Sequence, residues 1–468
     1  MQNTKHKKSI VGWWQLSVAL VFLFNPNVGL VDFLPDFIGY MLLCRALSRL
    51  SLIDDRMDDA HRLLRRMVYI TVARFSALFV TFGFVPYSDR ATMMLLLSFV
   101  FDVMELYTVI PALLKLSDGI LYLSERHGGE AAYYIPAKRR SRKNITQKMT
   151  TTAIVFAVAK ALCGTLPELS TLSGQGYDQS NWYEYLGMFR VLGFAVALVF
   201  GVVFLCCGLR YVGRLRAEKD YYAGLWNVYD GVMASHPDYL ARRAVLLSFM
   251  YFGVGAALAV DFGLDGLSSA GGGTLGSVNI IPDVLAAILI LAGLLTIKKY
   301  ITKCKILAVL ASIYFSVTAA YMALQYRFAA HYYVEAVGID PDTTSFYTLL
   351  CIVAIVCAAT YIVLLIVLMR LTIAEIIRSH TGFSMTSRDT YDPTERIGQL
   401  HRELMLKTIP VICVGVIAAV LEAVSVCLVS VVDFLWIFAF VADIVYAVLF
   451  VKLLGEIKTQ IDYKYMLS

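Results

Sequence analysis

The sequence predicts an all-α integral membrane protein of about twelve transmembrane helices, arranged as two parallel six-helix repeats with both termini in the cytoplasm. Three observations lead to this fold class. The composition is too apolar for a water-soluble domain, apolar runs of membrane length recur along the chain, and two motifs occur twice in the same order.

The composition is that of a protein with lipid as its solvent. Hydrophobic residues make up 59% of the 468 residues and charged residues 16%, with a mean hydropathy of +0.68. Soluble domains are about 45–50% apolar and about 25% charged. The nine cysteines form no C-x-x-C pair, and the chain carries no spacing typical of a metal, nucleotide or nucleic-acid site. We therefore expect the lipid bilayer as a partner, and no metal, no cofactor and no nucleic acid.

Apolar runs of about 20 residues predict the transmembrane spans. The first six are expected at Ile10–Phe24, Val31–Leu47, Met67–Phe84, Ala91–Leu114, Met149–Leu166 and Tyr185–Leu209. The second six are expected at Ala244–Val260, Val278–Ile297, Ile306–Leu324, Phe346–Met369, Thr408–Leu428 and Phe434–Val451. The run Ile10–Phe24 is the shortest, and the pairing of the two halves requires it to cross the membrane.

The basic residues predict the orientation of these spans. If the N-terminus is cytoplasmic, 36 of the 41 lysines and arginines fall in cytoplasmic segments or, in the case of Arg45, at the cytoplasmic end of a span. Of the other five, Arg74, Lys160 and Arg190 lie within spans, and only Arg90 and Arg327 lie in outer loops. Because positive charge accumulates on the cytoplasmic side of membrane proteins, we expect both termini there, with the plasma membrane as the location.

Two motifs occur twice and predict an internal duplication. Residues Gly29–Leu47 and Gly276–Leu294 share the pattern G-x-V-[DN]-[FI]-[LI]-P-D, followed by matching apolar positions. Residues Arg210–Tyr221 and Lys452–Tyr463 share a basic motif that closes each half. Since both closing motifs are basic, both belong in the cytoplasm. Each repeat then holds an even number of spans, which favours parallel over inverted halves.

The repeats define the predicted domain organisation. Residues 1–220 form the first six-span repeat, residues 221–243 a cytoplasmic connector, and residues 244–468 the second repeat. The connector begins with an aromatic segment that includes Tyr221, Tyr222 and Trp226. This composition is typical of a helix that lies along the membrane interface.

An aspartate follows a proline at the start of the second span of each repeat. Asp36 after Pro35 and Asp283 after Pro282 fit the first turn of a helix, where proline is tolerated and an acid complements the helix dipole. The alternative is an acidic vestibule at the outer face that collects a cationic substrate. Both interpretations remain open from the sequence.

Seven ionisable residues lie deep within the predicted spans, where charge is costly and often functional. They are Arg74, Lys160, Arg190, Asp102, Glu105, Glu422 and Asp443. Depths estimated from the helical rise pair Asp102 with Lys160, Glu105 with Arg74, and Glu422 with Arg190. Asp443 is then left without a basic partner. Pro111, shortly after Glu105, is expected to kink its helix.

Two functions fit these features. The first is a secondary transporter or flippase for a small molecule, lipid or cation, with the substrate between the two halves. Asp102 and Glu105 would couple transport to protons or a cation, with Lys160 and Arg74 as switching partners. The second is a non-transporting membrane subunit, sensor or assembly factor whose buried charges are structural ion pairs. Since no catalytic constellation occurs in the sequence, we do not expect an enzyme.

Overall fold

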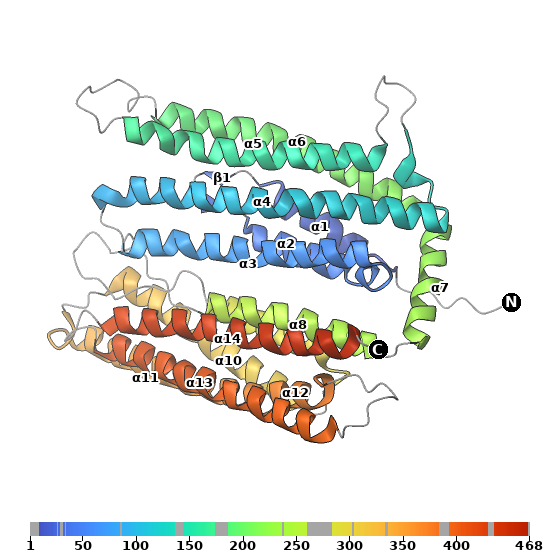
Figure 1. Ribbon diagram of the computed structural model, residues 1–468. Helices are drawn as coiled ribbons and strands as arrows, with labels where there is room; N and C mark the ends of the chain where they lie inside the picture. Colours follow the sequence, from blue (N-terminus) through green and yellow to red (C-terminus); the bar gives the residue numbers. More distant parts are fainter. Residues whose placement is uncertain are drawn as a thin grey trace. The chain divides into compact units, whose positions relative to one another are not determined.

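The computed structural model describes residues 9–25, 27–28, 31–32, 34–84, 87–135, 144–173, 186–235, 238–259, 283–301, 304–332, 336–382, 393–428 and 435–466. Over these residues the chain is almost entirely helical, with one two-residue β-ladder (Figure 1). It divides into two compact units, Met1–Pro237 and Asp238–Ser468. The boundary falls inside the predicted connector 221–243.

Unit 1 holds seven helices longer than one turn among its described residues. They are α1 (Trp13–Leu23), α2 (Asp36–Leu47), α3 (Asp55–Phe84), α4 (Tyr87–His127), α5 (Ile145–Ser173), α6 (Leu186–Ala217) and α7 (Lys219–Ser235). The strands β1 (Asn27–Val28) and β2 (Val31–Asp32) pair between α1 and α2. Short 3₁₀ turns at Leu50–Leu52 and Ala131–Tyr133 join neighbouring helices.

The first six helices of unit 1 form a closed ring. Each of α1 to α5 packs against the next helix in the chain, and α6 packs back against α1. A ring in this order places α2 opposite α5, so side chains from these two helices can meet only across its interior. The interior of this ring holds the buried charges described below.

Unit 2 repeats the same order of packing. Its described helices are α8 (Asp238–Leu258), α9 (Asp283–Ile297), α10 (Cys304–His331), α11 (Pro341–Val367), α12 (Ala374–His380), α13 (Pro393–Cys427) and α14 (Leu435–Met466), with a π-helical turn at Leu368–Ile373. Helices α8, α9, α10, α11, α13 and α14 each pack against the next, and α14 packs against α8. A large buried cluster that includes Phe252, Phe328 and Phe450 fills this ring.

Local sequence accounts for where several helices begin. Pro35 occupies the N-cap position of α2 with an extended backbone, and Asp36 follows in the first turn. Helix α9 begins at the equivalent residue, Asp283. At α11, Asp340 accepts a hydrogen bond from the Thr343 backbone N–H at 3.0 Å, with Pro341 as the first helical residue. Helix α4 continues through Pro111, and the kink predicted there stays a prediction.

The helices confirm that this is an all-helical integral membrane protein. Seven described helices are long and apolar enough to span a membrane: Thr92–His127, Gly187–Ala217, Tyr239–Leu258, Lys305–Phe328, Pro341–His380, Glu395–Cys427 and Ile437–Lys464. Two further apolar helices, Trp13–Leu23 and Val284–Ile297, are shorter. The other three predicted spans coincide with α2, α3 and α5, which fall short by length or apolarity over the described residues. The count of twelve spans stays a prediction.

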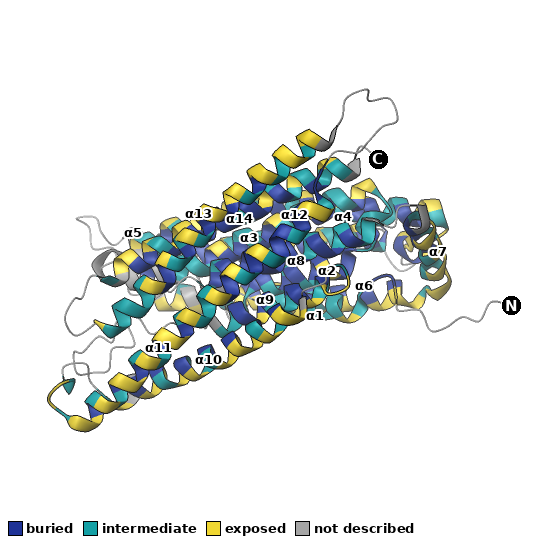
Figure 2. Cartoon of the chain, turned by 90° about the horizontal axis from the view of Figure 1, so that it is seen from below, coloured by how far each residue is buried: buried dark blue, intermediate teal, exposed yellow. Residues whose placement is uncertain are grey.

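Apolar side chains also line the outer faces of the long helices. Figure 2 shows exposed residues along α10, α11 and α13, alternating with buried ones. Many of the exposed residues are large and hydrophobic, such as Val191 at 70% and Val448 at 60% exposure. Exposed apolar surface on this scale is expected where lipid is the solvent.

Candidate functional site

A buried arginine joins two acids between α3 and α4. Arg74 Nη1 donates to Asp102 Oδ1 at 2.8 Å and to Glu105 Oε1 at 3.0 Å. The arginine side chain is 1% exposed, Asp102 is 6% exposed and Glu105 is 14% exposed. Asp102 and Glu105 are three residues apart, so both project from one face of α4 toward α3. The predicted pairing of Arg74 with Glu105 therefore occurs, and Asp102 shares it.

A second buried ion pair crosses the ring. Lys160 Nζ on α5 donates to Asp36 Oδ2 on α2 at 2.5 Å, and these side chains are 9% and 4% exposed. The predicted pairing of Lys160 with Asp102 is wrong, since matched depth cannot tell which helix lies across the ring. The Asp36 carboxylate is buried inside the ring, at the positive end of α2. A role of Asp36 in an outer vestibule stays a prediction.

Both ionic groups border one cavity inside unit 1. This cavity has a volume of about 80 Å³, and residues from all six ring helices line it, including Asp36, Asp102, Glu105 and Lys160. Among the described residues, this cluster brings together three carboxylates and two cationic side chains. Asp102 Oδ2 is buried and has no hydrogen-bond partner among the described residues. A buried acceptor in this state is available to a proton or a cation.

Three aromatic rings complete the wall of this polar cavity. Tyr40 from α2, Phe156 from α5 and Phe204 from α6 all line it. The rings of Phe156 and Phe204 stack with centroids 5.0 Å apart. Aromatic faces attract cations, most strongly in sites with little water. The cavity thus combines carboxylates with aromatic surfaces.

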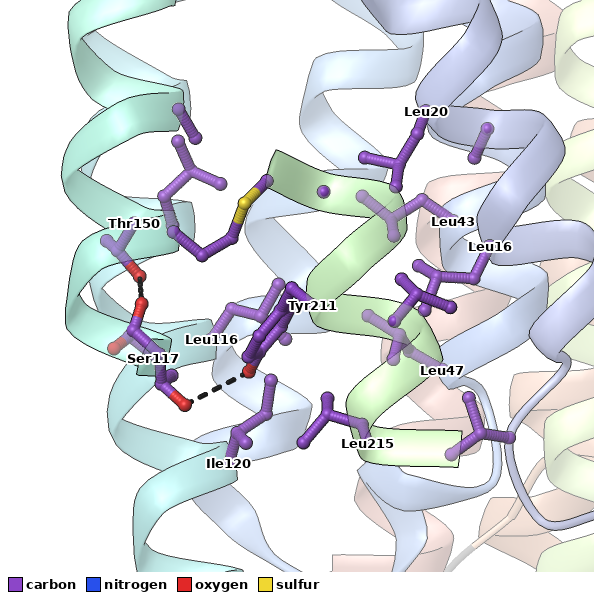
Figure 3. Close-up of a pocket in the computed structure, with 18 of the residues that line it drawn as sticks. Leu16, Leu20, Leu43, Leu47, Leu116, Ser117, Ile120, Thr150, Tyr211 and Leu215 are labelled. Atoms are coloured by element: carbon purple, nitrogen blue, oxygen red, sulfur yellow. Dashed lines mark hydrogen bonds between the residues drawn. The ribbon is translucent and has the colours of Figure 1, made fainter. Parts of the chain in front are cut away.

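A larger apolar cavity adjoins the polar one (Figure 3). Its volume is about 130 Å³, and its walls come from α1, α2, α4, α5, α6 and α7. The two cavities share five lining residues, Leu23, Leu43, Leu113, Ala153 and Phe204. Figure 3 shows Leu16, Leu20, Leu43 and Leu47 among the leucines of α1 and α2 on one side, with Leu116 and Ile120 of α4 on the other.

Three polar side chains of the apolar cavity, those of Thr146, Thr150 and Tyr211, are hydrogen-bonded within the protein. The Thr146 and Tyr211 hydroxyls lie 3.2 Å apart, and Thr146 Oγ1 also donates to the Ala132 carbonyl at 2.9 Å. Thr150 Oγ1 donates to the Thr146 carbonyl at 3.0 Å. Hydrogen bonds of this kind leave a surface that is mainly hydrocarbon.

Helix α7 contributes one residue to the wall of the apolar cavity. Tyr222 lines the cavity and its ring meets Trp13 edge-on, with centroids 4.9 Å apart. Just before α7, Glu218 Oε1 accepts hydrogen bonds from the backbone N–H groups of Glu130 at 2.8 Å and Ala131 at 2.5 Å. Burial raises the pKa of the Tyr221 phenol to about 12, so the phenol stays neutral near pH 7. These contacts hold α7 against the rest of unit 1.

Unit 2 holds a smaller acidic cavity. Glu422 from α13 and Asp443 from α14 both line a space of about 20 Å³, together with Tyr314, Tyr361 and Tyr446. Asp443, which depth matching left without a basic partner, therefore borders the same space as Glu422. The side chains of Arg190 and Asp283 lie outside the described residues, as does the predicted Glu422–Arg190 pair.

Sequence reasoning found the charges of this site and missed its apolar half. The sequence does not single out Trp13 and Phe204, because leucines and aromatic residues at helical spacing look the same whether they fill a core or line a cavity. The aromatic segment of α7 was the one available signal, and it was interpreted as a membrane-surface helix. Among the described residues, no group of three or more histidine, cysteine, aspartate or glutamate side chains is placed to hold a metal ion.

Comparison with known proteins adds no family. No family model, curated protein or solved structure matches this chain.

Proposed function

We propose that this protein is a secondary transporter or flippase in which the charges buried in unit 1 couple substrate movement to a proton or cation. One observation carries the proposal: Asp102, paired through Oδ1 with Arg74, presents its unbonded Oδ2 beside a cavity inside the ring. Buried charges in membrane proteins commonly mark ion and substrate pathways. Asp102 and Glu105 carry the exchangeable charge, and Arg74 and Lys160 are the switching partners.

The organisation of the chain supports the same proposal. Two six-helix rings with the same order of packing agree with a parallel six-plus-six duplication. We propose twelve spans, cytoplasmic termini and a location in the plasma membrane on the basis of the basic-residue distribution. In such proteins, substrate binds at sites buried within the helices and becomes accessible to each side in turn.

The test is ion-coupled flux in proteoliposomes. Purified protein is reconstituted with a pH-sensitive dye in the lumen, and an inward sodium gradient, a membrane potential or a fluorescent lipid in the outer leaflet is imposed. We expect wild-type protein to change the lumenal pH or move the lipid, and Asp102→Asn and Glu105→Gln to lose the effect. Asp59→Asn is the matched control, because Asp59 pairs with Lys115 where both side chains are about half exposed, away from both cavities.

Two results would overturn this function. The first is wild-type flux no higher than that of protein-free liposomes under every imposed condition. The second is unchanged flux in both Asp102→Asn and Glu105→Gln, since the proposed coupling groups would then be dispensable.

A non-transporting subunit is the second candidate, and the short Lys160–Asp36 pair favours it, since structural ion pairs have this geometry. The charge swap Asp36→Lys with Lys160→Asp distinguishes the transporter from the non-transporting subunit. A structural pair predicts that the swap restores folding and partner binding together. A transporter predicts that folding returns while coupled flux stays impaired, because the reversed pair changes the field at Asp102.

A further inference from the structure

Two cysteines of unit 2 meet between α11 and α13. Cys351 lies on α11 and Cys427 is the last residue of α13, and these two helices pack against each other. The Cys351 side chain is hydrogen-bonded to the Cys427 thiol and to the Tyr347 hydroxyl. Both cysteines are half-buried, and their thiols are free. Because a disulfide requires two cysteines that are close and point toward each other, this contact is the first requirement for one.

A contact that does not involve the thiols places the same helix ends together. The Tyr347 O–H donates to the Val426 carbonyl at 2.7 Å. Tyr347 is one turn before Cys351 on α11, and Val426 immediately precedes Cys427 on α13. The beginning of α11 therefore lies beside the end of α13, so the two helices run antiparallel.

Antiparallel packing also directs the two side chains toward each other. The Cα–Cβ bond of a helical residue tilts toward the N-terminus of its own helix. The Cys351 side chain thus leans toward the beginning of α11, where the end of α13 lies. The Cys427 side chain leans back along α13, toward the level of Cys351. The direction of each Cβ agrees with the thiol contact.

The position of the pair favours oxidation. In the proposed orientation the beginning of α11 and the end of α13 lie at the outer face of the membrane, and the predicted span of α13 ends at Leu428, one residue after Cys427. Disulfides form and persist on the outer side of a cell membrane and are rare in the cytoplasm.

We propose that Cys351 and Cys427 form a reversible disulfide that ties α11 to α13 at their outer ends. The oxidant is a second disulfide, either of a small thiol compound or of a thiol–disulfide oxidoreductase at the outer face. The inference goes beyond the proposed function, because the tie requires no transport.

The exchange proceeds in two steps that balance. One cysteine thiolate attacks a sulfur of the oxidant's disulfide, which forms a mixed disulfide and releases one oxidant thiolate. The thiolate of the second cysteine attacks the protein sulfur of this mixed disulfide and releases the other oxidant thiolate. The two protons lost by the cysteines convert the released thiolates to thiols. Two cysteines are oxidised and one oxidant disulfide is reduced.

Peptide mapping of the full-length protein tests the proposal. Purified protein is incubated with glutathione disulfide at about pH 8, where more thiol is ionised than at neutral pH. Remaining thiols are blocked with a maleimide, and the protein is digested with trypsin without a reductant. Cys351 then lies in the peptide 328–370 and Cys427 in the peptide 408–452. We expect mass spectrometry to detect these two peptides joined by a disulfide, and to lose the joined species after reduction with dithiothreitol.

Matched variants assign the bond to two sulfur atoms. The same two peptides also contain Cys357 and Cys413. Cys351→Ser and Cys427→Ser should each abolish the joined species, whereas Cys357→Ser and Cys413→Ser should retain it. Unfolding midpoints measured with reductant show whether each variant is folded. Oxidised wild-type protein should unfold at a higher denaturant concentration than reduced protein, because a cross-link restricts the unfolded chain. Cys351→Ser and Cys427→Ser should lose this difference.

Three results would overturn the proposal. The first is oxidised wild-type protein without the joined peptides, and the second is glutathione bound separately to Cys351 and Cys427 in place of a bond between them. The third is a joined species that persists in Cys351→Ser or Cys427→Ser. These outcomes are independent of ion-coupled flux, so the tie and the proposed function can fail separately.

Discussion

The ion pair across the ring of unit 1 allows a quantitative prediction. Lys160 Nζ lies 2.5 Å from Asp36 Oδ2, and both side chains are almost fully buried. Removing one partner of a buried pair costs about 3–5 kcal/mol, because the other charge is left without compensation. In Lys160→Met the Asp36 carboxylate remains at the positive end of α2, which offsets about 0.3–1 kcal/mol. We therefore expect a loss of about 2–4 kcal/mol in unfolding free energy.

The double variant Asp36→Leu with Lys160→Met should recover most of that loss. Replacing a buried ion pair by apolar residues of similar size is often neutral or stabilising. The two single losses should therefore fail to add, with a coupling energy of about 2 kcal/mol or more. A parallel cycle with Asp102→Asn and Lys160→Met should show weaker coupling, since Arg74 and not Lys160 holds Asp102.

Tryptophan fluorescence during denaturation in mixed micelles measures these energies for unit 1. The chain has five tryptophans, Trp13, Trp14, Trp182, Trp226 and Trp436, and only the last belongs to unit 2. In a Trp436→Phe background the signal therefore reports on unit 1. Strictly additive losses for Asp36 and Lys160, or stronger coupling of Lys160 to Asp102, would refute the ring arrangement.

Three further predictions concern other parts of the fold. Arg74→Met should destabilise unit 1 by about 3–5 kcal/mol in the same assay, since it leaves two buried acids uncompensated; an unchanged midpoint would contradict the buried network. Gly415→Ala should destabilise unit 2 by about 1–3 kcal/mol, because the added Cβ would lie 2.5 Å from a neighbouring side-chain atom. Gly455→Ala is its control and should be neutral or stabilising, since nothing lies within 4 Å of that position. The hydrogen bond from Lys115 lowers the pKa of Asp59, so the stabilising effect of this carboxylate is present above its unfolded pKa and is lost as the pH falls through the lowered value. The stability difference between wild type and Asp59→Asn should accordingly vanish in acid, and a difference that persists there would argue against the ion pair.

The helices could be predicted from the sequence because lipid imposes a simple length and composition. Runs such as Ala91–Leu114 and Phe346–Met369 lie within the apolar helices Thr92–His127 and Pro341–His380 to within a few residues. The limits of α3 were harder to predict. Its first turns, from Asp55 onward, are charged and helical, and no apolar signal marks them.

The contacts between helices could not be predicted in the same way. Depth matching found Arg74 with Glu105, because α3 and α4 are consecutive and pack together. It failed for Lys160, since only ring closure places α2 opposite α5. Asp36 lies in the first turn of α2, as one of the two interpretations of the sequence has it, yet its burial depends on that same closure.

Coupled flux in proteoliposomes tests the central claim most directly. The claim is that Asp102 and Glu105 couple substrate movement to a proton or cation. A pH-sensitive dye in the lumen records the response to an imposed ion gradient. The account predicts a change of lumenal pH with wild-type protein and with Asp59→Asn, and none with Asp102→Asn. A wild-type response no larger than that of protein-free liposomes, or an equal response from Asp102→Asn, would contradict it.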